Sequence, residues 1–318
     1  MQNKAAFWRR TPPAIFPPVM GLFGLGLAWR RAGEALALPA AVGELILGAV
    51  SLIFVFALAA WLAKALRRPA VVTEDLRPLP GRAGMAAMTM SLMLLAATLV
   101  PYAPRLALML LLAGFIAHLL LALLVVRVLF VGPDEARSVT PVWHLVFVGF
   151  IVAPLAGIPL GQAELAAPVL FACTGLAALI WAASLWQLVR RIPPPPLRPL
   201  LAIHLAPASL LATVAAMLGM GGYAAVMAVL AAVIFAALLA SARWIMEAGF
   251  SPMWGAFTFP LAAFASALFA VAGGSVLLQI AAGAVLALAT LAIPPIAFKV
   301  AQAWARGKLA AMTNAAQA

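Results

Sequence analysis

The chain has 318 residues, of which 67% are hydrophobic and only 9% are charged, and its mean hydropathy is +1.14. Soluble domains carry about 25% charged residues, so this composition excludes a soluble globular protein and predicts an integral membrane protein. The 20 Lys and Arg exceed the 8 Asp and Glu, which gives a formal net charge of +12. In a membrane protein such an excess indicates topology signals and contacts with anionic lipids, so we expect lipids as partners and no nucleic acid.

Long apolar segments recur along the chain, each near the roughly 20 residues that a helix needs to cross a bilayer. We expect ten membrane-spanning helices, at residues 12–29, 42–63, 83–101, 105–129, 141–160, 165–189, 197–218, 222–244, 252–272 and 276–298. The predicted fold class is therefore an all-α integral membrane protein with one transmembrane domain over residues 1–318. Residues 1–11 and 299–318 are expected to form terminal segments on one side of the membrane.

The basic residues indicate which side that is. With ten spans, 17 of the 20 Lys and Arg fall on the side of the termini, and the exceptions are Arg30, Arg31 and Arg105. Basic loops stay in the cytoplasm, so both termini are predicted to be cytoplasmic. We expect a multi-pass protein of the plasma (inner) membrane.

Three prolines lie inside apolar segments at equal intervals of 53 residues, namely Pro154, Pro207 and Pro260. A proline inside a helix removes a backbone hydrogen bond and bends the helix at a cost of about 3 kcal/mol. The first span contains Pro17 and Pro18, whereas the third has no proline in its interior. The pattern predicts kinks at Pro18, Pro154, Pro207 and Pro260, all in odd-numbered spans.

Odd- and even-numbered spans also differ in composition. The second and fourth spans consist almost entirely of large aliphatic residues, whereas the kinked spans are rich in small residues. A helix that is apolar all round faces lipid, and small residues favour close helix contacts. Because the loops are short, we expect five antiparallel helical hairpins, with the odd helices forming an inner ring and the even helices an outer ring.

Four short motifs stand in register with these spans: Pro17-Pro18-Val19-Met20-Gly21, Thr140-Pro141-Val142-Trp143, Leu205-Ala206-Pro207-Ala208 and Phe257-Thr258-Phe259-Pro260. In this pattern the chain resembles the TehA tellurite-resistance, slow-type anion channel and C4-dicarboxylate transporter family over its whole length. The resemblance implies five helical hairpins around a pseudo-fivefold axis, a pore in each protomer lined by the odd helices, and a homotrimer. It also implies that a phenylalanine in the ninth helix blocks the pore, and the matching residue is Phe259.

The residues around Phe259 suit such a gate. Phe259 lies seven residues after Pro252, so about 10 Å of helix rise carries it toward the middle of the membrane. A ring that projects into a narrow tube excludes water and ions. The alternative is that Phe259 is an ordinary packing aromatic.

No Lys, Arg, Asp or Glu falls in the middle of an odd-numbered span, so hydroxyl groups and helix ends would have to replace water around a passing anion. Such a lining binds weakly, and the ease of dehydrating the anion would set selectivity. The residues expected to line the pore are Phe16, Gly21, Thr89, Ser209, Thr213, Thr258, Ala263 and Ser266.

The preferred function is an anion channel for chloride or nitrate, with oxyanions such as tellurite or sulfite as further candidates. A coupled transporter or exporter of C4-dicarboxylates or oxyanions is the alternative, and His118 would then be the candidate for proton coupling. A permease built from two inverted repeats is a third class, against which the two-span period argues. The sequence contains no HExxH, GxSxG, CxxC or P-loop pattern, so we expect no enzyme, metal or cofactor.

Overall fold

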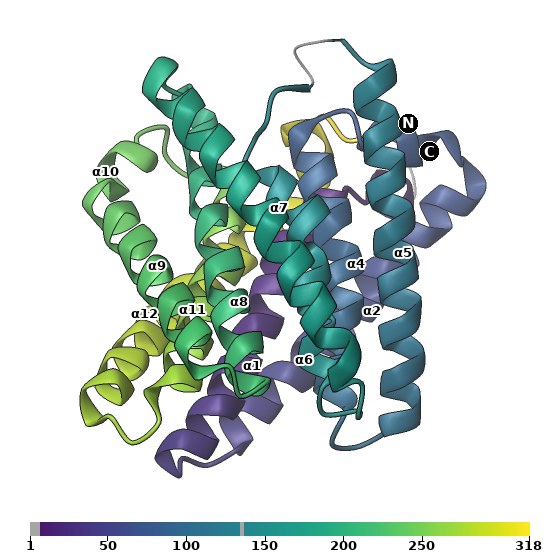
Figure 1. Cartoon of the computed structure of the whole chain (residues 1–318). Coiled ribbons are helices and arrows are strands. Elements are labelled where there is room, and N and C mark those ends of the chain that lie inside the picture. Colours follow the sequence, from purple (N-terminus) through teal and green to yellow (C-terminus); the bar gives the residue numbers. More distant parts are fainter. Residues whose placement is uncertain (1–6, 134–136) are drawn as a thin grey trace.

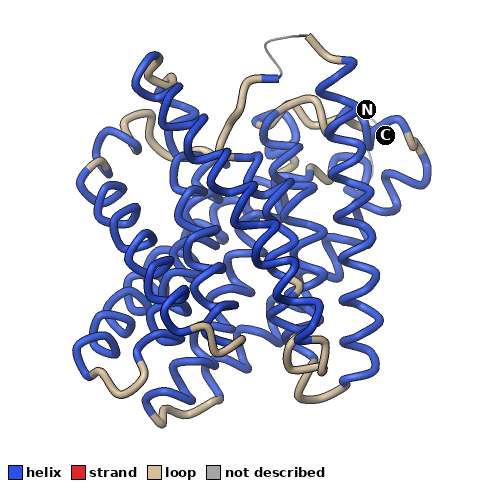
Figure 2. Tube along the Cα trace, in the orientation of Figure 1, coloured by secondary structure: helices blue, strands red, loops and turns tan. Residues whose placement is uncertain are grey.

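The computed structural model describes residues 7–133 and 137–318. Over these residues the chain consists of helices joined by short loops and turns, without a strand (Figure 2). Within the described residues, eight stretches are long and apolar enough to cross a membrane, which confirms the all-α membrane class but not the ten spans that were expected. They are α2(Ala41–Arg67), α4(Leu79–Leu99), α5(Pro104–Val131), α7(Ala163–Arg190), α9(Gly221–Ala240), α12(Val276–Ala305) and the composite stretches Pro195–Met217 and Pro252–Ala272.

Helices that follow one another in the chain pack as neighbours. Close pairs are α1(Phe16–Leu36) with α2, α4 with α5, α8(Leu205–Met217) with α9, and α11(Gly255–Ala272) with α12. The remaining long helix, α7, packs on an irregular segment that begins at His144. The backbone N–H of Ala318 donates to the carbonyl of Arg9 over 3.2 Å, so the C-terminus lies beside the first described helix, η1(Phe7–Arg10). The end of the molecule where they meet is called the terminal face below (Figure 1).

Burial divides the helices into two sets, as predicted. In the most apolar stretch of α4, 89% of residues are buried, and the values are 78% for Pro195–Met217 and 67% for Pro252–Ala272. In α2, α5, α7, α9 and α12 the values lie between 17% and 33%. The first set therefore packs inside the protein, with α1 in contact with both α4 and α11. The second set presents large apolar side chains outward, as a lipid-facing layer requires.

The first inner helix is longer than expected. The predicted span ended at residue 29, but α1 continues to Leu36 and ends where Ala37 adopts a left-handed backbone with φ of 52°. Arg30 is held inside the protein because it donates to the carboxylate of Glu44 and to a backbone carbonyl of α4. Two arginines that were expected in a loop thus belong to an inner helix.

The segment predicted to span residues 141–160 is not a regular helix. It runs as a π-helix η4(His144–Val148), a 3-10 helix η5(Gly149–Val152) and a short α6(Pro154–Gly157). Its apolar helical stretch, His144–Gly157, is shorter than the eight long ones. The count of ten membrane crossings therefore stays a prediction.

At the four prolines where kinks were predicted, a 3-10 helix precedes the α-helix that contains the proline. Pro154 is the first residue of α6, and Pro18 and Pro207 each stand third in the α-helix that contains them. The 3-10 helices η2(Pro13–Ile15), η5 and η6(Pro195–His204) lead into these α-helices. A first-turn residue has no intrahelical partner for its N–H, so a proline there costs little. Of the four prolines, only Pro260 lies beyond the first turn of its α-helix, α11, which η7(Pro252–Trp254) precedes.

The C-terminal tail packs on the terminal face. After α13(Leu309–Met312), the backbone N–H of Ala316 donates to Asp75 Oδ1 over 2.8 Å. Asp75 ends the short helix α3(Ala70–Asp75) and forms a fully buried ion pair with Lys64 of α2, with 2.8 Å between Nζ and Oδ2. The tail, α2 and the α2–α4 connection are thereby joined at one acidic residue.

Candidate functional site

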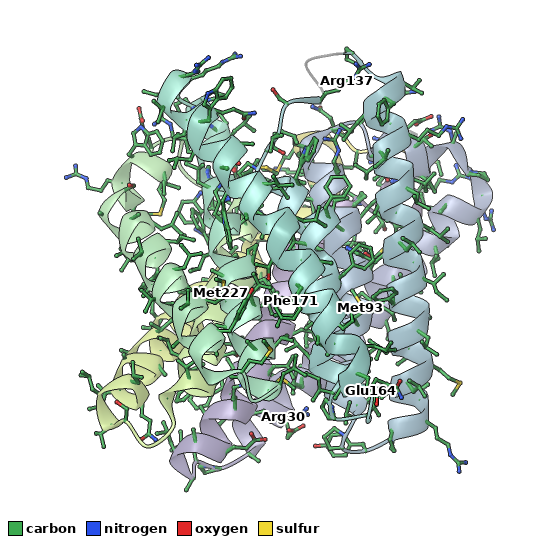
Figure 3. All side chains as sticks on the ribbon, in the orientation of Figure 1. Arg30, Met93, Arg137, Glu164, Phe171 and Met227 are labelled. Atoms are coloured by element: carbon green, nitrogen blue, oxygen red, sulfur yellow. The ribbon has the colours of Figure 1, made fainter. Side chains whose placement is uncertain are left out.

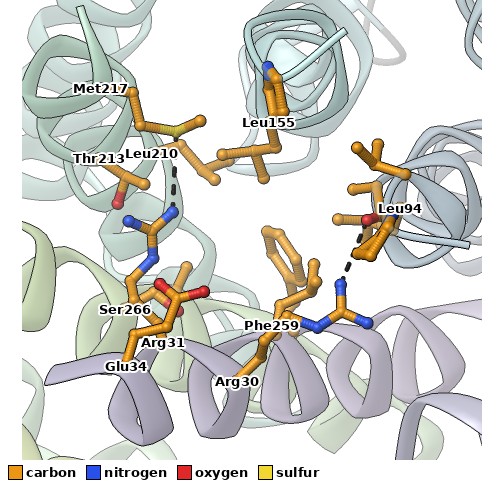
Figure 4. Close-up of a pocket in the computed structure, with 17 residues that line it drawn as sticks. Arg30, Arg31, Glu34, Leu94, Leu155, Leu210, Thr213, Met217, Phe259 and Ser266 are labelled. Atoms are coloured by element: carbon orange, nitrogen blue, oxygen red, sulfur yellow. Dashed lines mark hydrogen bonds between the residues drawn. The ribbon is translucent and has the colours of Figure 1, made fainter. Parts of the chain in front are cut away.

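A wide cavity of about 340 Å³ lies among the inner segments (Figure 4). Its wall includes Leu27 of α1, Leu94 of α4, Leu155 of α6, Leu210 of α8 and Ala263 of α11. Arg30, which also lines it, lies at the end of the molecule opposite Arg137 (Figure 3). Five separate segments thus enclose one space.

A narrow cavity of about 30 Å³ lies on the terminal side, between α1, α4 and α11 and the two 3-10 or π-helical segments that precede α6 and α8 in the chain. Its wall includes Met20 of α1, Ala83 of α4, Leu145 of η4, Ile203 of η6 and Ala256 of α11. Along α1 and α4, the residues that line the narrow cavity come before those that line the wide cavity, so the two cavities lie one after the other inside the protein.

Phe259 lies between the two cavities. Its side chain is 2% exposed and lines the wide cavity, while its helical neighbours Ala256 and Pro260 line the narrow one. The ring is seated against α1 at Gly24, where an added Cβ would lie 3.0 Å from Cδ2 of Phe259. Sequence reasoning found Phe259 but missed Gly24, whose lack of a side chain gives the ring its place.

Two more predicted site residues fix the helix that carries Phe259. Thr258 Oγ1 donates to the carbonyl of Gly255 over 2.7 Å and also lies 3.2 Å from the carbonyl of Pro17 in α1. Opposite it stands Gly21, where a Cβ would come within 2.2 Å of Thr258 Oγ1. Gly21 and Thr258 therefore belong to the close contact between α1 and α11, which sets the position of Phe259.

The other predicted lining residues fall into two groups. Thr213, Ala263 and Ser266 line the wide cavity. Ser209 is fully buried in α8 and donates to the carbonyl of Leu205 over 2.8 Å. A short hydroxyl side chain commonly bonds the carbonyl one turn earlier in its own helix, and Ser209 is used in that way.

Phe16 and Thr89 are directed toward outer helices. The ring of Phe16 packs edge-on against Phe54 of α2, with 6.1 Å between centroids. Thr89 Oγ1 lies 2.7 Å from His118 Nδ1 of α5. Both residues contribute to contacts between helices and not to the wall of either cavity.

The histidines are also packing residues. His118 is buried between Thr89 and Phe150, and the ring centroids of His118 and Phe150 lie 4.6 Å apart. His144 and His204 face each other, with 3.0 Å between Nε2 and Nδ1. None of the three lines either cavity.

Charged residues line the wide cavity, which sequence reasoning did not anticipate. Arg30, Arg31 and Glu34 of α1 all contribute to its wall (Figure 4). Both arginines were exceptions to the distribution of basic residues along the chain, and that anomaly was the signal that could have drawn attention to them. Among the described residues, no group of three His, Cys, Asp or Glu could hold a metal ion.

An all-helical membrane protein with two cavities among its inner helices has the architecture of a channel or carrier for small solutes. The sequence model of the SLAC1 family, described as voltage-dependent anion channels, matches residues 10–299. The chain therefore belongs to this family, which confirms the resemblance drawn from the four motifs. No curated protein sequence shows a significant match to the chain.

Proposed function

We propose that the chain conducts small inorganic anions through the path formed by the two cavities, and that Phe259 closes this path. Chloride and nitrate are the expected anions, with oxyanions such as tellurite or sulfite as further candidates. One observation carries the proposal: α1, α4 and α11 line both cavities, and Phe259 of α11 lines the wide one while its neighbours Ala256 and Pro260 line the narrow one.

A buried phenyl ring is an effective barrier because an anion must lose its water to pass it. Removing or turning this one ring is the smallest change that would join the cavities. The backbone is adapted to such a movement, since Pro260 has no N–H and leaves the carbonyl of Ala256 without its helical partner.

The alternative of a proton-coupled carrier receives less support. Such a carrier needs a titratable group that the path can reach, and the three histidines lie outside both cavities. The acidic residue in the wall of the wide cavity, Glu34, lies at its open mouth and is exposed. This arrangement favours passive flow over coupled transport.

The proposal includes an orientation and an assembly. The excess of basic residues on the terminal face supports cytoplasmic termini, so the wide cavity would open to the outside and the narrow one to the cytoplasm. The apolar outward faces of α2, α5, α7, α9 and α12 supply surface for lipid and for a homotrimer in the plasma membrane.

The test is Phe259→Ala in the full-length protein reconstituted into a planar bilayer. We expect chloride and nitrate currents much larger than those of the wild type, with a reversal potential that follows the anion gradient and not the proton gradient. Phe264→Ala is the matched control, because Phe264 is equally buried on α11 but packs on Phe235 of α9, away from both cavities. The control should stay as silent as the wild type.

The opposite outcome is equally clear. A silent Phe259→Ala protein, together with proton-linked malate or sulfite flux through the wild type, would establish the carrier and exclude the channel. Equal currents in Phe259→Ala and Phe264→Ala would show that loosening α11 anywhere opens a leak.

A further inference from the structure

We propose that Arg31 and Ser266 form an anion-binding site in the wide cavity that prefers oxyanions and carboxylates to halides. The site rests on the proposed function only for its place on a conduction path. Its existence as a binding site depends on the wide cavity alone.

Two adjacent arginines line this cavity, and the first has its charge and donors already occupied. Arg30 donates from Nε and Nη2 to the two carboxylate oxygens of Glu44, over 2.8 and 2.9 Å. The carbonyls of Ala97 and Thr98 accept further bonds from its Nη atoms, at 3.4 and 3.2 Å. Arg30 therefore holds α1 to α2 and α4, and little of its hydrogen-bonding capacity remains for a ligand.

Arg31, in contrast, has most of its hydrogen-bond donors free of the residues that the structure describes. Its one hydrogen bond within the described part of the chain runs from Nη2 to the sulfur of Met217, at 3.7 Å, and a thioether sulfur is a weak acceptor. The side chain is half-buried in the cavity wall and reaches across the cavity toward α8 (Figure 4). A guanidinium group removed from water needs strong acceptors for its N–H groups, and a bound anion would supply the acceptors that Arg31 lacks.

The two hydroxyl groups in the wall of the wide cavity, those of Thr213 and Ser266, also differ in whether their proton is already used in a hydrogen bond. Thr213 donates its proton to the carbonyl of Ser209 over 2.9 Å, so it presents lone pairs to the cavity. Ser266 makes no hydrogen bond within the described residues and can donate. It follows Phe259 by seven residues on α11, which places it about 10 Å farther along the helix. An anion held between Arg31 and Ser266 would therefore lie in the wide cavity, about 10 Å along α11 from the closing ring.

Glu34 opposes binding at this site. Its carboxylate lies beside Arg31 (Figure 4), although no ion pair within 4 Å joins the two. An ionised carboxylate at the mouth repels a second anion, and it is more exposed and better screened than Arg31. Removing the charge of Glu34 should strengthen anion binding, whereas removing that of Arg31 should weaken it.

The shape of the guanidinium group determines the preferred ligand. Its parallel N–H groups match two oxygens of a nitrate, sulfite or carboxylate, whereas chloride is a sphere that gains no second oriented contact. A lysine at the same position would keep the charge and lose the fork. The site thus predicts a preference for oxyanions that depends on arginine as well as on positive charge.

The first experiment measures binding in the purified full-length protein, as the rise in unfolding temperature with added nitrate or chloride. We expect Arg31→Gln to raise the half-saturating nitrate concentration about tenfold, which corresponds to about 1.4 kcal/mol. Arg31→Lys should bind nitrate and chloride alike, and Glu34→Gln should bind nitrate more tightly. Arg105→Gln removes an exposed arginine near the same end of the molecule but outside the cavity, and it should behave as the wild type.

The second experiment repeats the series in the Phe259→Ala background and measures the nitrate-to-chloride permeability ratio. If Arg31→Gln and Arg105→Gln agree in binding and in permeability, the proposed site is wrong even though the channel conducts. If Phe259→Ala passes no current while nitrate binding still depends on Arg31, the channel proposal fails and the binding site stands. Loss of nitrate binding in Arg31→Gln that Arg31→Lys fully restores would reduce the site to a positive charge without a preference for oxyanions.

Discussion

Helix α2 carries an ion pair near each of its ends, and the two pairs differ in their contact with solvent. Lys64 and Asp75, at the terminal face, are both 0% exposed. Arg30 and Glu44, at the other end, are 17% and 31% exposed, and Glu44 also accepts a hydrogen bond from Tyr102 over 2.8 Å. The first pair is sealed inside the protein, whereas the second stands at the rim of an open cavity.

The cavities repeat this difference. On the terminal side of Phe259 the space is about 30 Å³ and is walled by apolar side chains and prolines, whereas on the other side it is about 340 Å³ and contains three charged groups. An ion could keep much of its water in the wide cavity but not in the narrow one. We infer that the narrow cavity remains the main resistance to flow even when Phe259 is removed.

The largest expected effect is on stability, at the sealed end. Asp75→Ala leaves Lys64 as a buried charge without a counter-ion, although the carbonyl of Thr11 still accepts from it, and removes the acceptor for Ala316, so we expect a loss of about 3–5 kcal/mol. Glu44→Ala breaks the exposed pair, and Arg30 keeps its bonds to the α4 carbonyls, so the loss should be near 1 kcal/mol. Thermal unfolding of the two variants in detergent makes the comparison. An equal or larger loss in Glu44→Ala would contradict the distinction between a sealed and an open end.

The next effect is on conductance, and it uses two leucines that are matched in burial. Leu200 lines the narrow cavity and Leu210 the wide one, and each is 4% exposed. In the Phe259→Ala background, Leu200→Ala should raise single-channel conductance several-fold because it widens the narrow part of the path. Leu210→Ala widens a space that is already large and should change conductance less than twofold. The reverse order would place the main resistance in the wide cavity.

Much of the proposed path follows from the sequence, because its determinants are local. Phe259 precedes a proline within an apolar helix, and the division into inner and outer helices is visible in where small and large apolar residues gather. The structure places the inner set where those patterns indicate. Short-range composition is sufficient here because the membrane leaves a helix few alternatives.

The features that escaped prediction depend on contacts between distant segments. The first span was expected to end before Arg30, since charges after an apolar stretch usually mark the membrane surface. Arg30 instead bonds to Glu44 and to a carbonyl of α4, and α1 continues past it to Leu36. The 3-10 helices that precede the prolines could not be predicted from the sequence either, because 3-10 and α-helices have similar backbone angles.

The orientation of single side chains was similarly out of reach. Phe16 was expected in the pore, but it stands directly after a 3-10 turn and its ring packs on Phe54. The rotation of a helix about its own axis is fixed by such packing, and a sequence that is apolar all round carries no signal for it.

The smallest expected effect concerns the hydroxyl group at the open end. The hydrogen bond that Tyr102 donates to Glu44 raises the pKa of this tyrosine above its ordinary value. A raised pKa in an acid means that the bond stabilises the fold below about pH 10 and that this contribution is lost as the pH rises through the folded-state pKa. Because Tyr102 is 64% exposed, the contribution should be well under 1 kcal/mol.

Absorbance titration of tyrosinate isolates this group, since the chain has only one other tyrosine, Tyr223. In a Tyr223→Phe background, Glu44→Gln should lower the titration midpoint of Tyr102, because an amide oxygen is a weaker acceptor and carries no charge to oppose ionisation. Glu34→Gln removes a charge from the same mouth without touching Tyr102 and should leave the midpoint nearly unchanged. A midpoint that responds equally to both variants would mean that the general field of the mouth, and not the ion pair at its rim, acts on Tyr102. The hydrogen bond from Tyr102 to Glu44 would then contribute little, and the pair of Arg30 and Glu44 would differ from the pair of Lys64 and Asp75 more than their exposed fractions indicate.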